Sequence, residues 1–290
     1  MLALVIGASG QVGTALCARL AARGHTAVGT HNQVPQPGTR FLDLTDTGAT
    51  ERLIAELNPD WVFCPAGLPA VDYCEDHPGE AFGANRDAPA AAARAAAKQG
   101  GGFVYYSTEY VFDGTAGPYG EDDRVNPLSV YGRSKLEGER AVLADHKKAL
   151  VVRTTVVYGA EPQGKNFVYR LLRQARAGES TRAPIDQRSS PTYNPDLAAA
   201  TLELVDRGAR GLFHVAGPVV VDRYAFARTA CEVFALDPRL VTPVTTAELG
   251  QRARRPLNAG LRIDRVRALV TTALRRPADG LAAMRESLPR

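Results

Sequence analysis

The opening segment of this chain, residues 1–13, constrains its fold more than any other. Residues 2–6 form a short, nearly all-apolar run, which is typical of a parallel strand covered on both faces. Three glycines spaced by three, Gly7, Gly10 and Gly13, follow at once, and a helical pattern begins at Val12. A strand that turns through glycines into a helix predicts the first unit of a dinucleotide-binding sheet.

Strand and helix patterns then alternate over the first half of the chain. The apolar runs predict strands at residues 26–30, 40–42, 61–64, 103–106 and 149–157. Helices are expected at residues 12–23, 49–57, 88–99 and 130–145. For the alanine-rich helix we expect Asn85-Arg86-Asp87 as the start and Gly100-Gly101-Gly102 as the stop. This alternation predicts an α/β protein with a doubly wound parallel sheet.

The alternation breaks after Gly159, where polar and proline-containing segments appear. A helix at residues 196–207 and a strand at residues 211–215 then look like a return to the sheet. We therefore expect two interleaved parts with no clean linker. The expected dinucleotide-binding domain comprises residues 1–160 and 193–217, and a smaller C-terminal substrate-binding lobe comprises residues 161–192 and 218–290.

Composition argues against several other classes of protein. The net charge of +4 is small, and the arginines near the C-terminus are not interleaved with aromatic residues, so we expect no nucleic-acid partner. The four cysteines form no C-x-x-C pair, so we expect no metal site and a reducing compartment. The first strand starts at Leu2 and no apolar run is long enough to span a bilayer. We therefore expect a cytoplasmic protein without a membrane partner.

The glycine turn has the features of a diphosphate site. Gly7 permits the sharp turn off the strand, Gly10 lets the backbone approach the anion, and Gly13 allows the helix to pack closely on the sheet. The start of the helix, at Gln11 and Val12, is expected to present unpaired N–H groups and the positive end of the helix dipole. Glycines also occur in turns without a ligand, but this placement at a strand-to-helix turn favours a nicotinamide dinucleotide.

The end of the second expected strand bears on the choice of cofactor. It has no acidic residue to hold a ribose 2′-hydroxyl, and His31 or Arg40 is placed to approach a 2′-phosphate, so we expect NADP(H) rather than NAD(H). Asp43 either meets the adenine edge or caps a turn, and the two interpretations are equally weighted. Residues expected to complete the cofactor site are Leu44, Pro65, Ala66 and Gly67.

Tyr131 and Lys135 form a candidate proton relay. They are four residues apart, so on a helix they lie on one face. A free phenol has a pKa of about 10, and a neighbouring ammonium together with an oxidised nicotinamide ring would bring it towards neutrality. Lys135 is also placed to bind ribose hydroxyls. Such pairs recur by chance on helix surfaces, and the dinucleotide turn upstream is what favours catalysis here.

Two hydroxyls, Ser107 and Thr108, directly follow the strand expected at residues 103–106. The carboxyl ends of parallel strands face the ligand crevice, so a hydroxyl there can donate to a carbonyl oxygen that gains charge as hydride arrives. We expect Thr108 to do so. Either hydroxyl taken singly is also compatible with a turn-stabilising role. Glu109, next in the chain, is either a further acid or a loop carboxylate.

Taken together, these elements resemble the extended short-chain dehydrogenase/reductase superfamily. The closest resemblance is to dTDP-4-dehydrorhamnose reductases and their relatives, which include the regulatory β subunit of methionine adenosyltransferase. The segments that carry it are Ser107-Thr108-Glu109-Tyr110-Val111-Phe112-Asp113-Gly114, Pro127-Leu128-Ser129-Val130-Tyr131-Gly132-Arg133-Ser134-Lys135, Val71-Asp72-Tyr73-Cys74-Glu75, Asp186-Gln187-Arg188-Ser189-Ser190-Pro191-Thr192 and Arg255-Pro256-Leu257-Asn258. The chain departs from the pattern at three places: Glu109 for Asp, Pro69-Ala70 for Thr-Asn, and Ser189 for Gly.

The resemblance implies a Rossmann fold and an NAD(P)H-dependent reductase of a nucleotide-linked 4-keto-6-deoxysugar. It implies that Tyr131 gives the proton, with Thr108 and Lys135 as the other catalytic residues. Substrate contacts are expected at Val71, Ser107, Thr108, Glu109 and Arg188. A homodimer is one assembly compatible with the resemblance.

Two other functions compete with reduction. One is a non-catalytic, cofactor-binding regulatory subunit, against which the complete set of catalytic residues argues mildly. The other is a nucleotide-sugar epimerase or dehydratase. Dehydratases of this superfamily place two acids after the threonine, whereas here Glu109 is followed by Tyr110, so this function is the least favoured.

Overall fold

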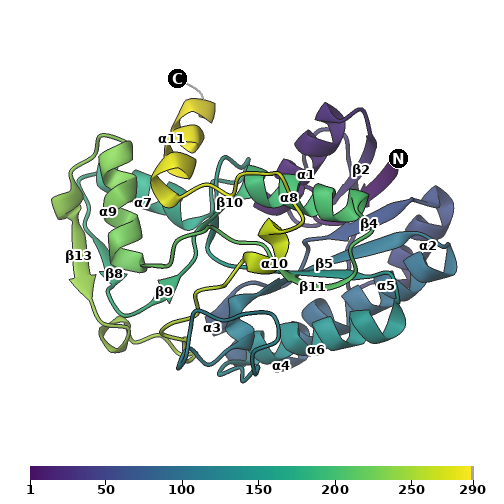
Figure 1. Cartoon of the computed structure of the whole chain (residues 1–290), viewed down its shortest axis with the longest axis horizontal. Helices are drawn as coiled ribbons and strands as arrows, with labels where there is room; N and C mark the ends of the chain where they lie inside the picture. The colour runs from purple at the N-terminus through teal and green to yellow at the C-terminus, as the bar shows by residue number, and fades with distance from the viewer. Residues whose placement is uncertain (289–290) are drawn as a thin grey trace.

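The computed structural model describes residues 1–288, and a seven-stranded parallel sheet forms its centre (Figure 1). The strand order is β11-β6-β5-β4-β1-β2-β3. These strands are β1 (Leu2–Val5), β2 (Thr26–His31), β3 (Thr39–Phe41), β4 (Trp61–Cys64), β5 (Gly102–Thr108), β6 (Leu150–Thr154) and β11 (Gly211–His214). The chain runs outward from β1 to one edge and outward from β4 to the other, which confirms the doubly wound sheet.

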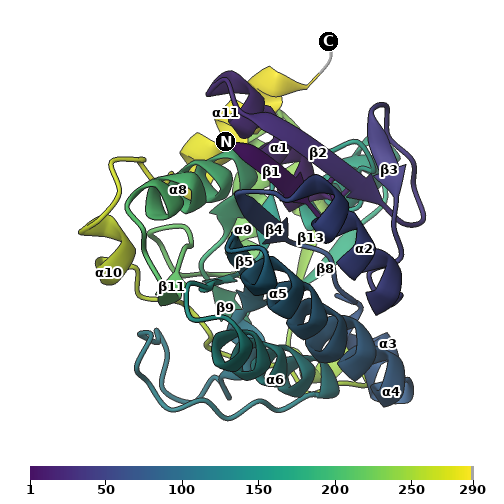
Figure 2. The ribbon, with the colours of Figure 1, turned by 90° about the vertical axis from the view of Figure 1, so that its right-hand side faces the viewer.

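Helices cover both faces of this sheet (Figure 2). They are α1 (Gln11–Ala22) and α8 (Asn194–Asp206) on one face, and α2 (Thr47–Leu57), α5 (Ala88–Lys98) and α6 (Val130–Asp145) on the other. Alternate residues of a strand supply the two cores, as the strand period requires. In β1, Ala3 and Val5 pack with α1 and α8, whereas Leu4 packs with α2 and α5.

The second half of the chain adds smaller elements beside the sheet, most of them at the left of Figure 1, with α11 at the top and α10 near the centre. Three two-stranded sheets pair β10 with β7, β12 with β9 and β13 with β8. The elements are β7 (Val157–Tyr158), α7 (Phe167–Arg176), β8 (Thr181–Pro184), β9 (Arg188–Ser189), β10 (Thr192–Tyr193), β12 (Val221–Asp222), α9 (Arg223–Val233), β13 (Val241–Val244), α10 (Asp264–Arg267) and α11 (Pro277–Ser287). Tyr158, Phe226 and Met284 belong to their apolar core. No helix among residues 1–288 has the length and hydropathy needed to cross a membrane.

The single strand predicted at residues 149–157 is wrong. The structure divides this run into β6 and β7, because Val156 between them has a positive φ of 41°. That conformation is unfavourable for a β-branched residue and interrupts an extended strand. After the break the chain leaves the central sheet, and β7 pairs with β10.

The predicted start of the alanine-rich helix at Asn85-Arg86-Asp87 is also wrong. The chain is already helical from α4 (Pro78–Phe82), and a π-helical turn, η1 (Gly83–Asp87), joins α4 to α5. Asn85 caps no helix. Its side chain instead bonds the backbone of Leu68, through Oδ1 at 2.9 Å and Nδ2 at 3.1 Å. The preceding short helix α3 (Val71–Asp76) was not predicted.

Candidate active site

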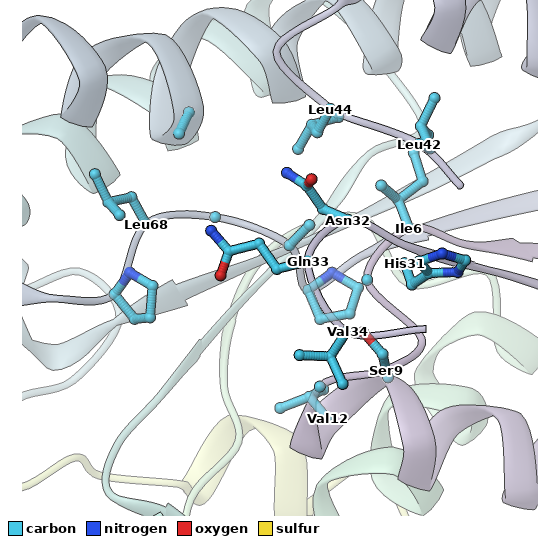
Figure 3. A pocket seen from close by; sticks show the side chains of 18 of the residues that line it. Ile6, Ser9, Val12, His31, Asn32, Gln33, Val34, Leu42, Leu44 and Leu68 are labelled. Atoms are coloured by element: carbon cyan, nitrogen blue, oxygen red, sulfur yellow. The ribbon is translucent and has the colours of Figure 1, made fainter. Parts of the chain in front are cut away.

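A cavity of about 480 Å³ lies at the carboxyl ends of β1, β2 and β4, where the strand order reverses; we call it the glycine-turn cavity. In Figure 3, His31, Asn32 and Gln33 lie along it, with Leu44 on one side and Val12 on the other. Every residue predicted to hold the cofactor, apart from Arg40, Tyr131 and Lys135, lines this cavity. These residues are Gly7, Gly10, Gln11, Val12, Gly13, His31, Asp43, Leu44, Pro65, Ala66 and Gly67.

The glycine turn at the base of this cavity is shaped to admit an anion. Gly7 has a positive φ of 93°, and the N–H of Gly10 donates to the oxygen of Gly7 at 3.1 Å. A Cβ on Gly13 would lie 2.1 Å from that oxygen, whereas one on Gly10 would meet nothing closer than 3.5 Å. No side chain caps the start of α1. The free N–H groups and open backbone therefore fit a diphosphate.

The end of β2 differs in part from the prediction. Nδ1 of His31 lies 2.7 Å from Oγ1 of Thr39, and the ring lines the cavity. Arg40 does not line it, because its guanidinium is paired with Glu56 at 2.9 Å. The approach of Arg40 to a 2′-phosphate stays a prediction. Asp43 does line the cavity, and its carboxylate also accepts from the N–H of Thr45 at 2.9 Å, so it caps a turn as well.

A smaller cavity of about 130 Å³ adjoins the first, and we call it the tyrosine cavity because Tyr131 lines it with Lys135 and Ser107. Residues shared by the two cavities are Pro65, Gly67, Leu68 and Pro69. Tyr131 and Lys135 are one turn apart on α6. Ser129 caps the start of this helix, because its hydroxyl accepts a hydrogen bond from the N–H of Gly132. The structure thus brings the Tyr-Lys pair to the rim of the glycine-turn cavity.

Burial sets the protonation of this pair. It raises the pKa of Tyr131 above its usual value, the Glu109 carboxylate raises that pKa further, and the Thr108 hydroxyl opposes the increase. The predicted lowering by Lys135 is not seen in the protein alone. The ammonium of Lys135 donates to the carbonyl of Tyr106 at 2.6 Å, and burial lowers its pKa to about 8.

The two hydroxyls at the end of β5 are both engaged. Ser107 donates to Glu139, whose carboxylate also accepts two bonds from Arg153, at 2.8 and 2.7 Å. Thr108 donates to Oε2 of Glu109 at 2.8 Å. Ser107 lines the tyrosine cavity, and Thr108 lies close enough to Tyr131 to affect its pKa. The two hydroxyls end β5 and do not follow it as predicted.

A third cavity, of about 410 Å³, is rich in cations, and we call it the arginine cavity. Val71 lines it, as predicted for a substrate contact. Arg188 does not, because it is an exposed residue of β9 whose N–H donates to the carbonyl of Leu257 at 2.6 Å. The cations that do line the cavity are Lys165, Arg170, Arg182, Arg223 and Arg255. Within residues 1–288, no carboxylate lines it.

Arg255 carries the clearest ligand signal in the arginine cavity. Its side chain is 7% exposed and pairs with Asp72 at 2.8 Å through Nη2 alone. Its Nε and Nη1 are buried without a partner in the described part of the chain. Buried, unpaired guanidinium nitrogens are costly, and an anionic ligand would satisfy them.

Comparison with known proteins assigns the family. A family model described as the RmlD substrate binding domain matches residues 1–289. The chain belongs to this family. Membership of the RmlD substrate binding domain family confirms the resemblance that the sequence motifs indicated.

Named relatives in this family include enzymes and a subunit. The dTDP-4-dehydrorhamnose reductase of Mycobacterium tuberculosis (strain CDC 1551 / Oshkosh) is 39% identical over 259 residues, which cover 87% of this chain and 82% of the relative. The methionine adenosyltransferase 2 subunit beta of Bos taurus is 32% identical over 273 residues, covering 92% and 81%. A solved structure of the dTDP-4-dehydrorhamnose reductase of Bacillus anthracis, in complex with NADP, matches with a TM-score of 0.91, 27% identity and 99% coverage of both chains.

One of the three departures from the reductase motifs lies at the cavities. Pro69 lines both the glycine-turn and tyrosine cavities, and Ala70 precedes α3 without a capping side chain. Glu109 is buried beside Thr108. Ser189 lies in β9, where it pairs with Val221 of β12.

Sequence reasoning missed several cavity residues. Asn32 and Gln33 line the glycine-turn cavity, and their position just after β2 was the available signal. The arginines of the third cavity had no such signal, because α7, β8 and α9 bring them together from separate segments. Arg255 alone among them lay in a recognised motif.

Proposed function

We propose that this chain is an NAD(P)H-dependent reductase of a nucleotide-linked 4-keto-6-deoxysugar, with dTDP-4-dehydrorhamnose as the reference substrate. One observation carries the proposal. The tyrosine cavity, with Tyr131 and Lys135, opens beside the glycine-turn cavity and shares part of its wall. A proton donor therefore lies where the redox end of a dinucleotide held by the glycine turn would reach.

The glycine turn and the residues after β2 hold the cofactor in this proposal. When bound, the reduced nicotinamide supplies the hydride. The absence of a carboxylate among His31, Asn32, Gln33 and Val34 favours NADP(H), because an acid there would repel a 2′-phosphate. The NADP in the Bacillus anthracis relative is in keeping with this preference.

Tyr131 supplies the proton to the carbonyl oxygen while hydride adds to the carbonyl carbon. Burial raises the pKa of Tyr131, so the phenol keeps its proton at neutral pH, which is the form that a reductase requires. Lys135 stabilises the phenolate that remains. Thr108 polarises the carbonyl by donating its proton, which requires that its bond to Glu109 be exchanged for one to the substrate.

The arginine cavity holds the nucleotide diphosphate in this proposal. Its cations match two phosphates, and Arg255 has unpaired nitrogens for them. We propose residues 161–192 and 218–290 as the substrate-binding lobe, since α7, β8 and α9 in it supply Arg170, Arg182 and Arg223. Arg188 is left out of the site.

Replacement of Tyr131 by Phe tests the proposal. With NADPH and dTDP-4-dehydrorhamnose, we expect Tyr131→Phe to lower turnover by about 10² to 10⁴-fold, because it removes the proton donor alone. The matched control is Tyr73→Phe, at an exposed tyrosine outside the three cavities, which should keep full turnover. Unchanged turnover in Tyr131→Phe would overturn the assigned role.

A regulatory role is the second candidate, and the similarity to the Bos taurus subunit favours it. A regulatory subunit would bind NADP(H) in the same glycine-turn cavity but would reduce no keto-sugar nucleotide. Measurable NADPH oxidation with dTDP-4-dehydrorhamnose by the isolated chain decides for the reductase.

A further inference from the structure

A short segment, residues 160–166, lies between two of the cavities. Lys165 in this segment lines both the glycine-turn cavity and the arginine cavity. Among residues 1–288, no other residue lines both. The two cavities therefore meet at one lysine side chain.

The segment is fastened to the glycine turn at two points. Nε2 of Gln163 donates to the carbonyl of Ser9 at 2.8 Å. Nδ2 of Asn194, on α8, bridges two carbonyls, that of Gln11 at 3.0 Å and that of Ala160 at 3.1 Å. These bonds hold residues 160–163 against the turn that would carry the cofactor diphosphate.

The backbone at Lys165 is fixed as well. Oε1 of Glu161 accepts from the N–H groups of both Lys165 and Asn166 at 2.8 Å. Nη1 of Arg173 donates to the carbonyl of Gly164 at 2.6 Å. The ammonium of Lys165, in contrast, makes no hydrogen bond or ion pair with the described residues. A fixed backbone with an uncommitted charge is suited to a ligand.

The distribution of charge says what that ligand is. Lys165 is the one lysine or arginine among the described residues lining the glycine-turn cavity, whereas four arginines line the other. If the proposed function holds, each cavity receives a diphosphate, and the two like charges repel across the junction. A cation shared between them offsets that repulsion.

We propose that Lys165 is a binding residue for both diphosphates and couples the binding of the dinucleotide to that of the nucleotide sugar. This inference rests on the proposed function. Coupling is reciprocal, so each ligand must change the affinity for the other by the same factor. Loss of Lys165 should make each ligand oppose the other.

The test measures dissociation constants in place of turnover. NADP⁺ is titrated calorimetrically into the protein with and without saturating dTDP, for wild type, Lys165→Met, Lys165→Arg and Arg182→Met. The quantity of interest is the ratio of the two NADP⁺ dissociation constants. We expect Lys165→Met to shift this ratio by about tenfold towards antagonism, and Lys165→Arg to restore it. Arg182 lines the arginine cavity but not the glycine-turn cavity. Arg182→Met therefore removes a cation from one cavity only, and we expect it to leave the ratio unchanged.

The outcomes separate the two proposals. A wild-type protein that binds no dTDP overturns the proposed function and this inference with it. Binding of both ligands, with the same ratio in wild type and Lys165→Met, overturns the role of Lys165 and leaves the proposed function standing. A shifted ratio in Lys165→Met and an unshifted one in Arg182→Met support the coupling.

Discussion

The Thr108 hydroxyl and the Glu109 carboxylate are hydrogen bonded to each other inside the protein, at 2.8 Å. Both residues are buried, and the N–H of Tyr110 donates to the same hydroxyl at 3.3 Å. Burial raises the pKa of Glu109, and the Thr155 and Thr108 hydroxyls offset part of that increase. The Thr108 hydroxyl can therefore donate to a ligand only once its bond to Glu109 is broken.

Glu109 should make stability depend on pH. Its pKa is raised in the folded state, so its favourable contribution is present below its unfolded pKa and is lost as pH rises through the folded pKa. Glu109→Gln removes this ionisation. We expect the urea midpoint of wild type to fall, relative to that of Glu109→Gln, as pH rises from about 4.5 towards neutrality. Parallel midpoints across that range would contradict the assignment.

Lys135 should act on turnover and on stability in the alkaline range. Lys135→Met should lower turnover by about 10²-fold or more, since it removes the cation that stabilises the phenolate. In wild type the folded pKa of Lys135 is about 8, below its usual value of 10.5. Unfolding then takes up a proton between these values, so wild type should gain stability relative to Lys135→Met as pH rises from 8 to 10.5. Thermal midpoints of both proteins check the sign.

Arg255 and Arg188 form a matched pair for the substrate site. Arg255 is buried in the arginine cavity with unpaired nitrogens, whereas Arg188 is exposed and lines none of the three cavities. We expect Arg255→Met to weaken dTDP binding by about 10 to 100-fold and to leave NADP⁺ binding unchanged, because a charge-assisted bond is lost. Arg188→Met should alter neither. Equal effects of the two substitutions in calorimetry would count against the arginine cavity.

Substitutions at Gly13 and Gly10 should have different effects, one on the stability of the fold and the other on the binding of the cofactor. A Cβ on Gly13 would overlap the oxygen of Gly7, so Gly13→Ala should lower the free energy of unfolding by about 1–3 kcal/mol. A Cβ on Gly10 meets no protein atom closer than 3.5 Å, and we expect it to occupy space that a bound diphosphate would need. Gly10→Ala should therefore keep its stability and lose NADP⁺ affinity. Urea unfolding and NADP⁺ titration of both variants measure the two effects.

The buried pair of Glu139 and Arg153 should be costly to break. Both side chains are 4% exposed and share two bonds. Glu139→Gln leaves an uncompensated buried guanidinium, so we expect a loss of about 3–5 kcal/mol in unfolding free energy. The control is Asp145→Asn, which breaks the partly exposed pair with Arg94 and should cost at most about 1 kcal/mol. Similar urea midpoints for the two variants would refute the distinction.

The features that the sequence predicted are those encoded by neighbouring residues. The glycine turn, and Tyr131 with Lys135 on one face of α6, depend on spacings of three and four along a single segment. Their positions at adjoining cavities then follow from the parallel sheet, whose strands all end at the same edge.

The features that it did not predict depend on tertiary context. The positive φ of Val156 has no residue signature, because β-branched residues disfavour it. Asn85 looks like a helix start, yet its amide is committed to the backbone of Leu68. The pKa of Tyr131 could not be foreseen either. Its direction is set mainly by burial, which local spacing does not reveal.

Helix α6 aligns three groups at intervals of four, namely Tyr131, Lys135 and Glu139. The last of these reaches back to Ser107 on β5, and Gly138 beside it lies so close to the carbonyl of Asn85 that no side chain fits there. These contacts fix the rotation of the helix about its own axis. One inserted residue between Tyr131 and Glu139 would turn everything beyond it by about 100°. Such an insertion would therefore take Tyr131 out of line with Glu139.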